Sequence, residues 1–191
     1  MPKLRTLIFG GSFDPIHVGH TSLAAEALRC NLADEVWFMV SPQNPLKQDR
    51  SLTDENHRLA MARLAVAGEP RFVACDFEFH LPRPSYTLHT LQALEKVYPD
   101  RQFILLIGAD NWACIDKWYS PKEIISRYSI VVYPRGAETP VQLPENVHLL
   151  SSPLFDVSST MVRELLSKNK DVLNYIAPAV YNYIKENKLY E

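Results

Sequence analysis

The stretch from Leu4 to His20, LRTLIFGGSFDPIHVGH, decides the fold. Its first part, Leu4 to Phe9, is an apolar run of strand length that ends at a glycine pair. Gly10 and Gly11 let the backbone come close to a ligand, and a helix is expected to start near His17. A strand, a glycine turn and a helix in this order are typical of the ligand-binding edge of a doubly wound parallel sheet.

The remaining chain alternates short apolar runs with helical patterns. Near-continuous apolar runs such as residues 103–107 suit strands that are covered on both faces, as in parallel sheets. We predict an α/β fold: a doubly wound, open parallel sheet of the Rossmann-like kind, with a C-terminal helical segment, in a single domain over residues 1–191. Strands are expected at 4–9, 35–40, 72–75, 103–107, 129–133 and 147–150, and the last helix at 178–186.

Capping patterns predict where three helices begin. Thr53-Asp54-Glu55 resembles a cap before a helical pattern from Arg58 to Ala67, and Ser85 can cap a helix that runs through Val97. Ser120-Pro121-Lys122-Glu123 matches a capping box with proline at the first helical position. The stretch 135–146 is rich in proline and glycine and is expected to be a surface loop.

Composition and charge argue against several classes of protein. A net charge of -2 offers no basic footprint, so nucleic acid is not an expected partner. No apolar run reaches the length of a membrane span, and the N-terminus lacks a secretory apolar region. Cys30, Cys75 and Cys114 form no CxxC pair, which argues against a disulfide framework or a zinc site. We expect a cytoplasmic protein with reduced thiols, as a monomer or a homo-oligomer.

His17 and His20 are the first candidates for chemistry. Three residues apart, they share a face of the expected helix, whose N-terminus would present free N–H groups to a phosphate. Imidazoles there can donate hydrogen bonds and stabilise charge in a transition state. A plain turn and a metal pair are the alternatives, but no third and fourth metal ligands lie nearby. Three of the chain's six glycines fall in residues 10–19, which favours a functional site.

The stretch GGSFDPIHVGH resembles the signature of the nucleotidyltransferase superfamily with an HxGH motif. That superfamily includes nicotinate mononucleotide, pantetheine-phosphate and glycerol-phosphate nucleotidyltransferases, and class I aminoacyl-tRNA synthetases are distant relatives. The resemblance implies that His17 and His20 contact the triphosphate of ATP. It also places the turn before them in the ATP site, namely Gly10, Gly11, Ser12 and Phe13.

A second phosphate site is predicted near the C-terminus. The run from Val157 to Arg163, VSSTMVR, precedes an apolar helical pattern, so its hydroxyls can be plain N-caps. Arg163 adds a guanidinium one turn beyond them, and a helix start with hydroxyls and a guanidinium can hold phosphate. The run also resembles the superfamily's ISSTxxR element, which implies that Ser159, Thr160 and Arg163 bind ATP.

The middle of the chain resembles one branch of this superfamily, the bacterial nicotinate mononucleotide adenylyltransferases. Three elements carry the likeness: Glu78 and Arg83 with the SYT run, IGAD at 107–110 followed by KWY at 117–119, and the RLAM helix at 58–61. Gly108 and Asp110 are assigned to ATP by this likeness. Trp118 is either a packing residue or a stacking platform for a pyridine ring. The acceptor-binding candidates are Ser85, Tyr86, Thr87, Asp110 and Trp118.

One element departs from that branch. The run PQNPLK at 42–47 resembles its NxPPHK element, but Leu46 stands where histidine is usual. Lys47 is retained and can reach a phosphate, so it joins His17, His20 and Arg163 as a candidate catalytic residue.

The expected reaction transfers AMP from ATP to nicotinate mononucleotide, giving nicotinate adenine dinucleotide in NAD biosynthesis. Mg²⁺ is expected to arrive with ATP and to have few protein ligands. The same chemistry on nicotinamide mononucleotide or pantetheine phosphate stays open, as does a non-catalytic nucleotide-binding regulator. A disulfide- or metal-dependent binding module is disfavoured by the cysteine pattern.

Overall fold

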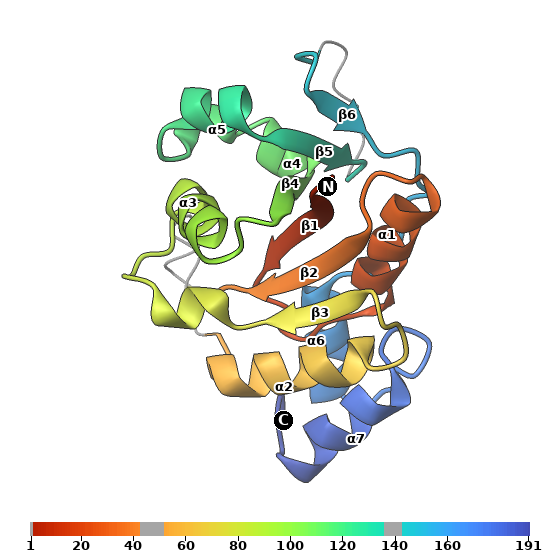
Figure 1. Ribbon diagram of the computed structural model, residues 1–191. Helices are drawn as coiled ribbons and strands as arrows, with labels where there is room; N and C mark the ends of the chain where they lie inside the picture. Colours follow the sequence, from red (N-terminus) through yellow and green to blue (C-terminus); the bar gives the residue numbers. More distant parts are fainter. Residues whose placement is uncertain (1, 43–51, 136–142) are drawn as a thin grey trace.

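The computed structural model describes residues 2–42, 52–135 and 143–191. In these parts of the chain, a six-stranded sheet carries helices on both faces (Figure 1). The strand order is β3-β2-β1-β4-β5-β6, and every neighbouring pair is parallel. The order reverses between β1 and β4, the point at which doubly wound sheets bind ligands. The predicted fold class is confirmed.

The strands agree with the prediction to within two residues at each end. They are β1 (Leu4–Gly11), β2 (Glu35–Val40), β3 (Phe72–Cys75), β4 (Arg101–Gly108), β5 (Ser129–Tyr133) and β6 (Val147–Leu149). The helices are α1 (Val18–Arg29), α2 (Glu55–Val66), α3 (Thr87–Val97), α4 (Ala109–Trp112), α5 (Pro121–Arg127), α6 (Ser159–Ser167) and α7 (Pro178–Glu186). Two 3₁₀ turns accompany them, η1 (Phe77–His80) and η2 (Ile115–Lys117).

The sheet separates two apolar cores, because neighbouring residues of a strand point to opposite faces. In β1, Leu7 and Phe9 join the core covered by α1, α2, α6 and α7. Ile8 joins the other core, under α3, α4 and α5. Burial on both faces explains why the strands read as unbroken apolar runs. The carboxyl edge of the sheet is therefore where the chain can present polar groups to a ligand.

Two of the three predicted helix caps are wrong in detail. Asp54, the middle residue of the predicted cap, caps α2, and its carboxylate accepts the N–H of Asn56 at 2.9 Å; the helix therefore starts at Glu55, three residues earlier than predicted. At α3 the N-cap position is held by Tyr86, one residue after Ser85. Ser120 holds the N-cap position of α5 and Pro121 follows at the first helical position, as predicted. With a left-handed backbone (φ 50°), however, Ser120 makes no side-chain cap bond, so the capping box does not form. A capping hydroxyl needs an extended backbone to reach the first free N–H groups.

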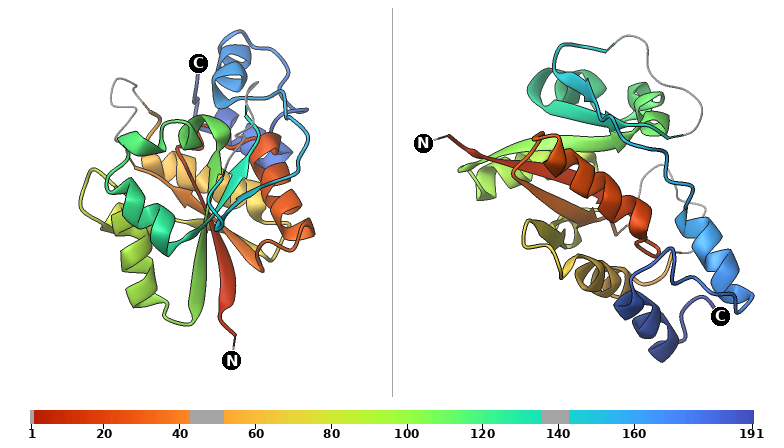
Figure 2. Two further views of the ribbon diagram at one scale, coloured as in Figure 1. Left: turned by 90° about the horizontal axis from the view of Figure 1, so that it is seen from above. Right: turned by 90° about the vertical axis from the view of Figure 1, so that its right-hand side faces the viewer.

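The C-terminal helical segment lies on the α1 and α2 face of the sheet. Figure 1 shows α7 beside α2, and α6 behind β3 and α2. The two termini lie at opposite ends of the molecule (Figure 2). Within the described ranges, no helix combines the length and the apolar character that crossing a membrane requires.

Candidate active site

The histidine pair lies where β1 passes into α1. His17 is the N-cap residue of α1, with an extended backbone at φ -140°. The rings of His17 and His20 stack, with centroids 3.6 Å apart and planes 25° from parallel. The backbone N–H of His17 donates to Nδ1 of His20 at 3.2 Å. A neutral His20 therefore carries its proton on Nε2, which is left as a hydrogen-bond donor.

Burial lowers the pKa of both imidazoles. The pKa of His17 falls to about 4, first through burial and then through the positive charge of Arg135. Burial, with the charges of His17 and Arg135, holds the pKa of His20 well below its usual range. Both rings are neutral near pH 7, so they can serve a phosphate as donors but not as cations. Positive charge at this site has to come from other side chains.

This lowered pKa predicts how stability depends on pH. The unfolded chain takes up a proton at His17 near pH 6.5, whereas the folded protein does so only near pH 4. Stability is therefore highest above pH 6.5 and falls as the pH drops through this window, by roughly 3 kcal/mol for this one group. We expect His17→Asn, which keeps a good N-cap, to flatten the fall measured by denaturant unfolding from pH 7 to pH 4. An unchanged slope would contradict the buried, neutral His17.

Gly19 brings the two motifs into contact. A Cβ atom at this position would lie 2.9 Å from Cγ1 of Val157 and 3.1 Å from the ring of His17. Distances this short leave no room for a side chain. The glycine of the HxGH motif thus lets the start of the second motif pack directly against the first.

The second motif is tied to the turn that precedes His17. Ser159 Oγ donates to the carbonyl of Pro15 at 2.9 Å, and Arg163 Nη1 donates to the carbonyl of Asp14 at 2.5 Å. Arg163 Nη2 also donates to Thr160 Oγ1 at 3.3 Å. The N-cap role belongs to Ser158, whose Oγ accepts the N–H of Met161. The structure therefore brings Arg163 to the histidine motif, across 149 residues of sequence.

The other residues assigned to ATP differ in which of their atoms are accessible to a ligand. Gly10 is exposed, and a Cβ there would meet nothing within 4 Å. The ring of Phe13 is buried in the core between Phe9, His20 and Phe38, so only its backbone can face a ligand. Asp110 is exposed, and its carboxylate lies 3.5 Å from Arg135.

A cavity of about 140 Å³ opens beside this turn, between α3 and the region of α4 and α5. It is lined by the glycines that end β1 and β4, and by residues that the sequence resemblance singled out. Among these lining residues are Gly10, Gly11 and Gly108, with Glu78, Ser85, Tyr86, Thr87, Lys117, Trp118 and Tyr119. The predicted acceptor residues are thus brought together, except for Asp110, which does not line the cavity.

The cavity wall holds two polar atoms that have no partner among the described residues. Ser85 Oγ and Trp118 Nε1 are buried and make no hydrogen bond to any described residue. Such groups are costly to bury unless a ligand or water satisfies them. Trp118 is half-buried and also packs against the core under α3. It therefore has a packing role and a face toward the cavity at once.

Glu78 adds a buried carboxyl group to the same wall. Its two oxygens accept hydrogen bonds from Ser41 Oγ at 2.8 Å and from Thr90 Oγ1 at 2.9 Å. Burial raises the pKa of Glu78, although both hydroxyls oppose that rise. The side chain links the end of β2 to α3 and leaves neither oxygen without a partner.

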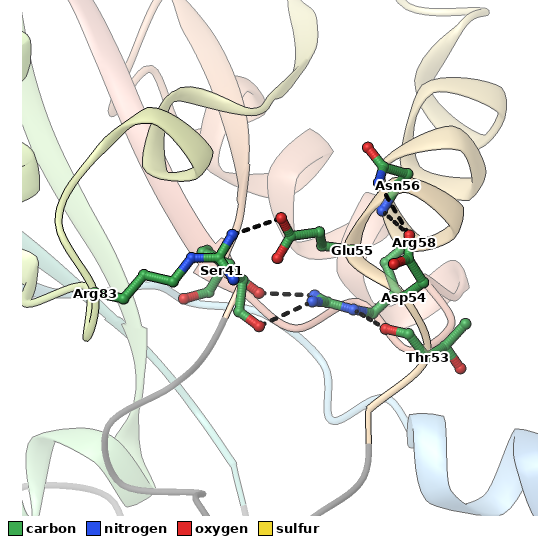
Figure 3. A network of polar contacts seen from close by, with 8 residues as sticks. Ser41, Thr53, Asp54, Glu55, Asn56, Arg58 and Arg83 are labelled. Atoms are coloured by element: carbon green, nitrogen blue, oxygen red, sulfur yellow. Dashed lines mark hydrogen bonds and ion pairs between the residues drawn. The ribbon is translucent and has the colours of Figure 1, made fainter.

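Arg58 is a site residue whose importance sequence reasoning missed. The side chain is only 1% exposed, and its guanidinium donates to the carbonyls of Ser12, Ser41, Thr53 and Pro42 at 2.7–3.1 Å. Figure 3 shows this guanidinium facing Ser41 and Thr53, with Arg83 facing Glu55 nearby. Through these hydrogen bonds, Arg58 connects the loop after β1 to the loop after β2. Only the resemblance of its helix to the RxxM element pointed to it.

Arg135 was also missed, and it places a cation near the histidines. It lies just beyond the carboxyl end of β5, at the ligand edge of the sheet, and its charge lowers the pKa of both histidines. Its place just after a predicted strand, where a parallel sheet binds ligands, was the only feature of the sequence that could have identified Arg135 as a site residue.

Lys47 and Leu46 lie outside the described residues. Among the residues that are described, no group of three His, Cys, Asp or Glu side chains is arranged to hold a metal ion. A magnesium ion that arrives with ATP therefore stays a prediction.

Comparison with known proteins defines the class and then the family. The cytidylyltransferase-like family model matches residues 8–165. A Bacteroides fragilis protein named "Probable nicotinate-nucleotide adenylyltransferase" is 50% identical over 96% of this chain and 92% of its own length. A Cytophaga hutchinsonii protein of the same name is 40% identical over 96% of both chains. This chain belongs to the nicotinate-nucleotide adenylyltransferase family.

Solved structures share the fold. The nicotinic acid mononucleotide adenylyltransferase of Plasmodium falciparum, solved as a complex with NaAD, aligns with a TM-score of 0.80. The alignment covers 98% of this chain and 97% of that one, at 23% identity. A second structure of that protein, complexed with APC, aligns with a TM-score of 0.78.

Proposed function

We propose that the protein transfers AMP from ATP to nicotinate mononucleotide and so forms nicotinate adenine dinucleotide and pyrophosphate, a step of NAD biosynthesis. One observation carries this proposal beyond family membership. Arg163 and Ser159 hydrogen-bond to the turn before His17, so two phosphate-binding motifs meet beside one cavity.

In the proposed reaction, an oxygen of the mononucleotide 5′-phosphate attacks the α-phosphorus of ATP. The new P–O bond forms as the bond to the β-phosphate oxygen breaks, and pyrophosphate leaves in line. A phosphate monoester is already an anion near neutral pH, so the reaction needs no protein nucleophile. Catalysis then depends on position and on charge stabilisation.

Neutral and charged side chains are proposed to have different roles in this reaction. The neutral rings of His17 and His20 supply N–H donors, and the guanidinium of Arg163 supplies positive charge and a fork suited to phosphate. Lys47 is proposed to add a second cation. Mg²⁺ bound to the triphosphate of ATP would neutralise the leaving pyrophosphate, and it is proposed to keep several of its waters in place of protein ligands.

The cavity is proposed as the acceptor site. Ser85 Oγ and Trp118 Nε1 have no hydrogen-bond partner among the described residues and can bond a polar ligand group. The start of α3 lies here without a side-chain cap, and its first N–H groups would suit a carboxylate. Lys117 adds a cation to the lining. Glu78 would repel a carboxylate and could favour the amide, but both its oxygens already accept hydroxyl hydrogen bonds. We therefore propose that the acid is preferred.

The proposal is tested by pyrophosphate release from ATP with one acceptor at a time. Nicotinate mononucleotide, nicotinamide mononucleotide and pantetheine phosphate are compared at equal concentration. We expect the highest kcat/KM with the acid. A higher value with the amide or with pantetheine phosphate would reassign the acceptor. ATP binding without pyrophosphate release from any of them would indicate a regulator.

Trp118 provides a test of the acceptor site. We expect Trp118→Leu to weaken acceptor binding by about 1–3 kcal/mol, since it removes the stacking surface. ATP affinity should stay unchanged. The measurement is a titration of the folded variant with nicotinate mononucleotide, together with its thermal melt.

Trp37→Leu is the matched control. Trp37 is 5% exposed in β2, and its Nε1 also lacks a partner among the described residues. This variant should lose stability but keep its acceptor affinity. If Trp118→Leu behaved in the same way, Trp118 would be a packing residue only.

A cytosolic location is also proposed. Cys30, Cys75 and Cys114 are all free thiols, as expected where thiols stay reduced. Burial raises the pKa of Cys75 to about 11, so this thiol is unreactive at neutral pH.

A further inference from the structure

The turn that leads into the histidine pair is held by side chains from distant parts of the chain. Arg58 donates to the carbonyl of Ser12, and Arg163 donates to the carbonyl of Asp14. The carboxylate of Asp14 accepts the hydroxyl of Tyr190 at 2.5 Å and the N–H of Thr53 at 3.4 Å. Asp14 therefore contacts α6, the segment just before α2, and Tyr190.

Asp14 is buried and needs these donors. Its exposed fraction is 4%, and no described Lys, Arg or His side chain lies within ion-pair distance of it, although its charge interacts with that of the buried Arg58 at longer range. A buried carboxylate without donors is costly, so the hydroxyl of Tyr190 is a main partner. Burial raises the pKa of Tyr190 well above its usual value, and the hydroxyl keeps its proton to donate.

Tyr190 reaches this point from the second-to-last position of the chain. Its backbone is left-handed, at φ 64°, a conformation that residues other than glycine rarely adopt. The N–H of the preceding Leu189 donates to the carbonyl of Ile184, which ties the tail to the end of α7. The C-terminus thereby lies at the end of the molecule opposite the N-terminus (Figure 2).

We propose that Tyr190 is a positioning residue for the triphosphate site: it orients Asp14, and Asp14 in turn orients Arg163 and the start of α1. One face of Asp14 meets Tyr190 through the carboxylate, and the other meets Arg163 through the carbonyl. A shift of Asp14 therefore moves the guanidinium that is proposed to hold phosphate. Groups that bind a transition state work only when neighbouring residues hold them in place.

Tyr183 offers a matched comparison in the same segment. Its hydroxyl lies 2.8 Å from Nδ1 of His57, so it too joins the C-terminal segment to α2. Among the described residues, Tyr183 makes no hydrogen bond or ring contact with the turn at residues 12–15 or with Arg163. The two tyrosines thus share an anchoring role, and only Tyr190 also reaches the site.

The test compares Tyr190→Phe with Tyr183→Phe. We expect both variants to melt below the wild type, because each loses the hydrogen bonds of its hydroxyl group. Only Tyr190→Phe should bind a non-transferable ATP analogue more weakly, by roughly three- to ten-fold, with the KM for the mononucleotide unchanged. Equal analogue affinity in Tyr190→Phe and the wild type would overturn the proposal, whatever the melts show.

A double-mutant cycle decides whether the effect passes through Arg163. In the Arg163→Ala background, Tyr190→Phe should cause little further loss of analogue affinity. A full, additive loss would show that Tyr190 does not act through this residue and would overturn the proposed route. The inference rests on the ATP half of the proposed function. Failure of that function appears in the wild type as absent pyrophosphate release, whereas failure of this inference appears as equal analogue affinities.

Discussion

Replacing His20 with alanine is expected to slow AMP transfer by roughly 10²–10³-fold while the protein stays folded, the loss typical for one preorganised donor to a developing charge. The ring of His20 is neutral, and Nδ1 is occupied by the N–H of His17. Its Nε2–H is then the group available to the triphosphate. Pyrophosphate release under saturating substrates measures the loss, and circular dichroism checks the fold.

Two further substitutions separate the donor from the structural bond. His20→Asn retains an acceptor near the position of Nδ1 but has no group at Nε2, so it should be as slow as the alanine variant. His20→Gln places an amide donor near Nε2 and should recover part of the rate. His148→Ala, an exposed histidine on β6, is the control and should behave like the wild type. Near wild-type turnover in His20→Asn would remove the Nε2 donor from the mechanism.

The second large effect is expected at Arg163. Arg163→Ala should lower kcat/KM for ATP by about 10- to 100-fold, the scale of a lost hydrogen bond to a charged group. Arg163→Lys keeps the charge but loses the fork and should fall between alanine and wild type. The KM for the mononucleotide should change little, because Arg163 contacts the turn at Asp14 and does not line the acceptor cavity.

Arg71→Ala is the matched control for the two Arg163 variants. Arg71 is exposed and forms its ion pair with Glu69 at 2.9 Å, before β3. Exposed pairs of this kind contribute little, so both kinetic constants should stay near the wild type. If Arg163→Ala raised the KM of the mononucleotide and spared that of ATP, the two phosphate sites would have been assigned the wrong way round.

The local sequence was sufficient to predict the helices and strands and the order of the motifs along the chain. The apolar runs that form β1 and β4 are recognisable because parallel strands are buried on both faces, which needs no knowledge of neighbours. The glycine turn and the histidine spacing are local too, and they predicted the start of α1 near His17 correctly. Asp54 could be identified as a cap because a capping bond spans two residues.

Contacts between distant segments could not be obtained in this way. Gly19 has no room for a side chain because Val157 packs against it. The position of Arg163 depends on its hydrogen bond to the carbonyl of Asp14, 149 residues away in the sequence. The lowered pKa of His17 and the buried role of Arg58 also arise from packing. The sequence by itself determined which chemical groups the protein carries and on which elements they lie. Only the tertiary structure decided which of them meet, because burial and long-range hydrogen bonds depend on how the chain packs.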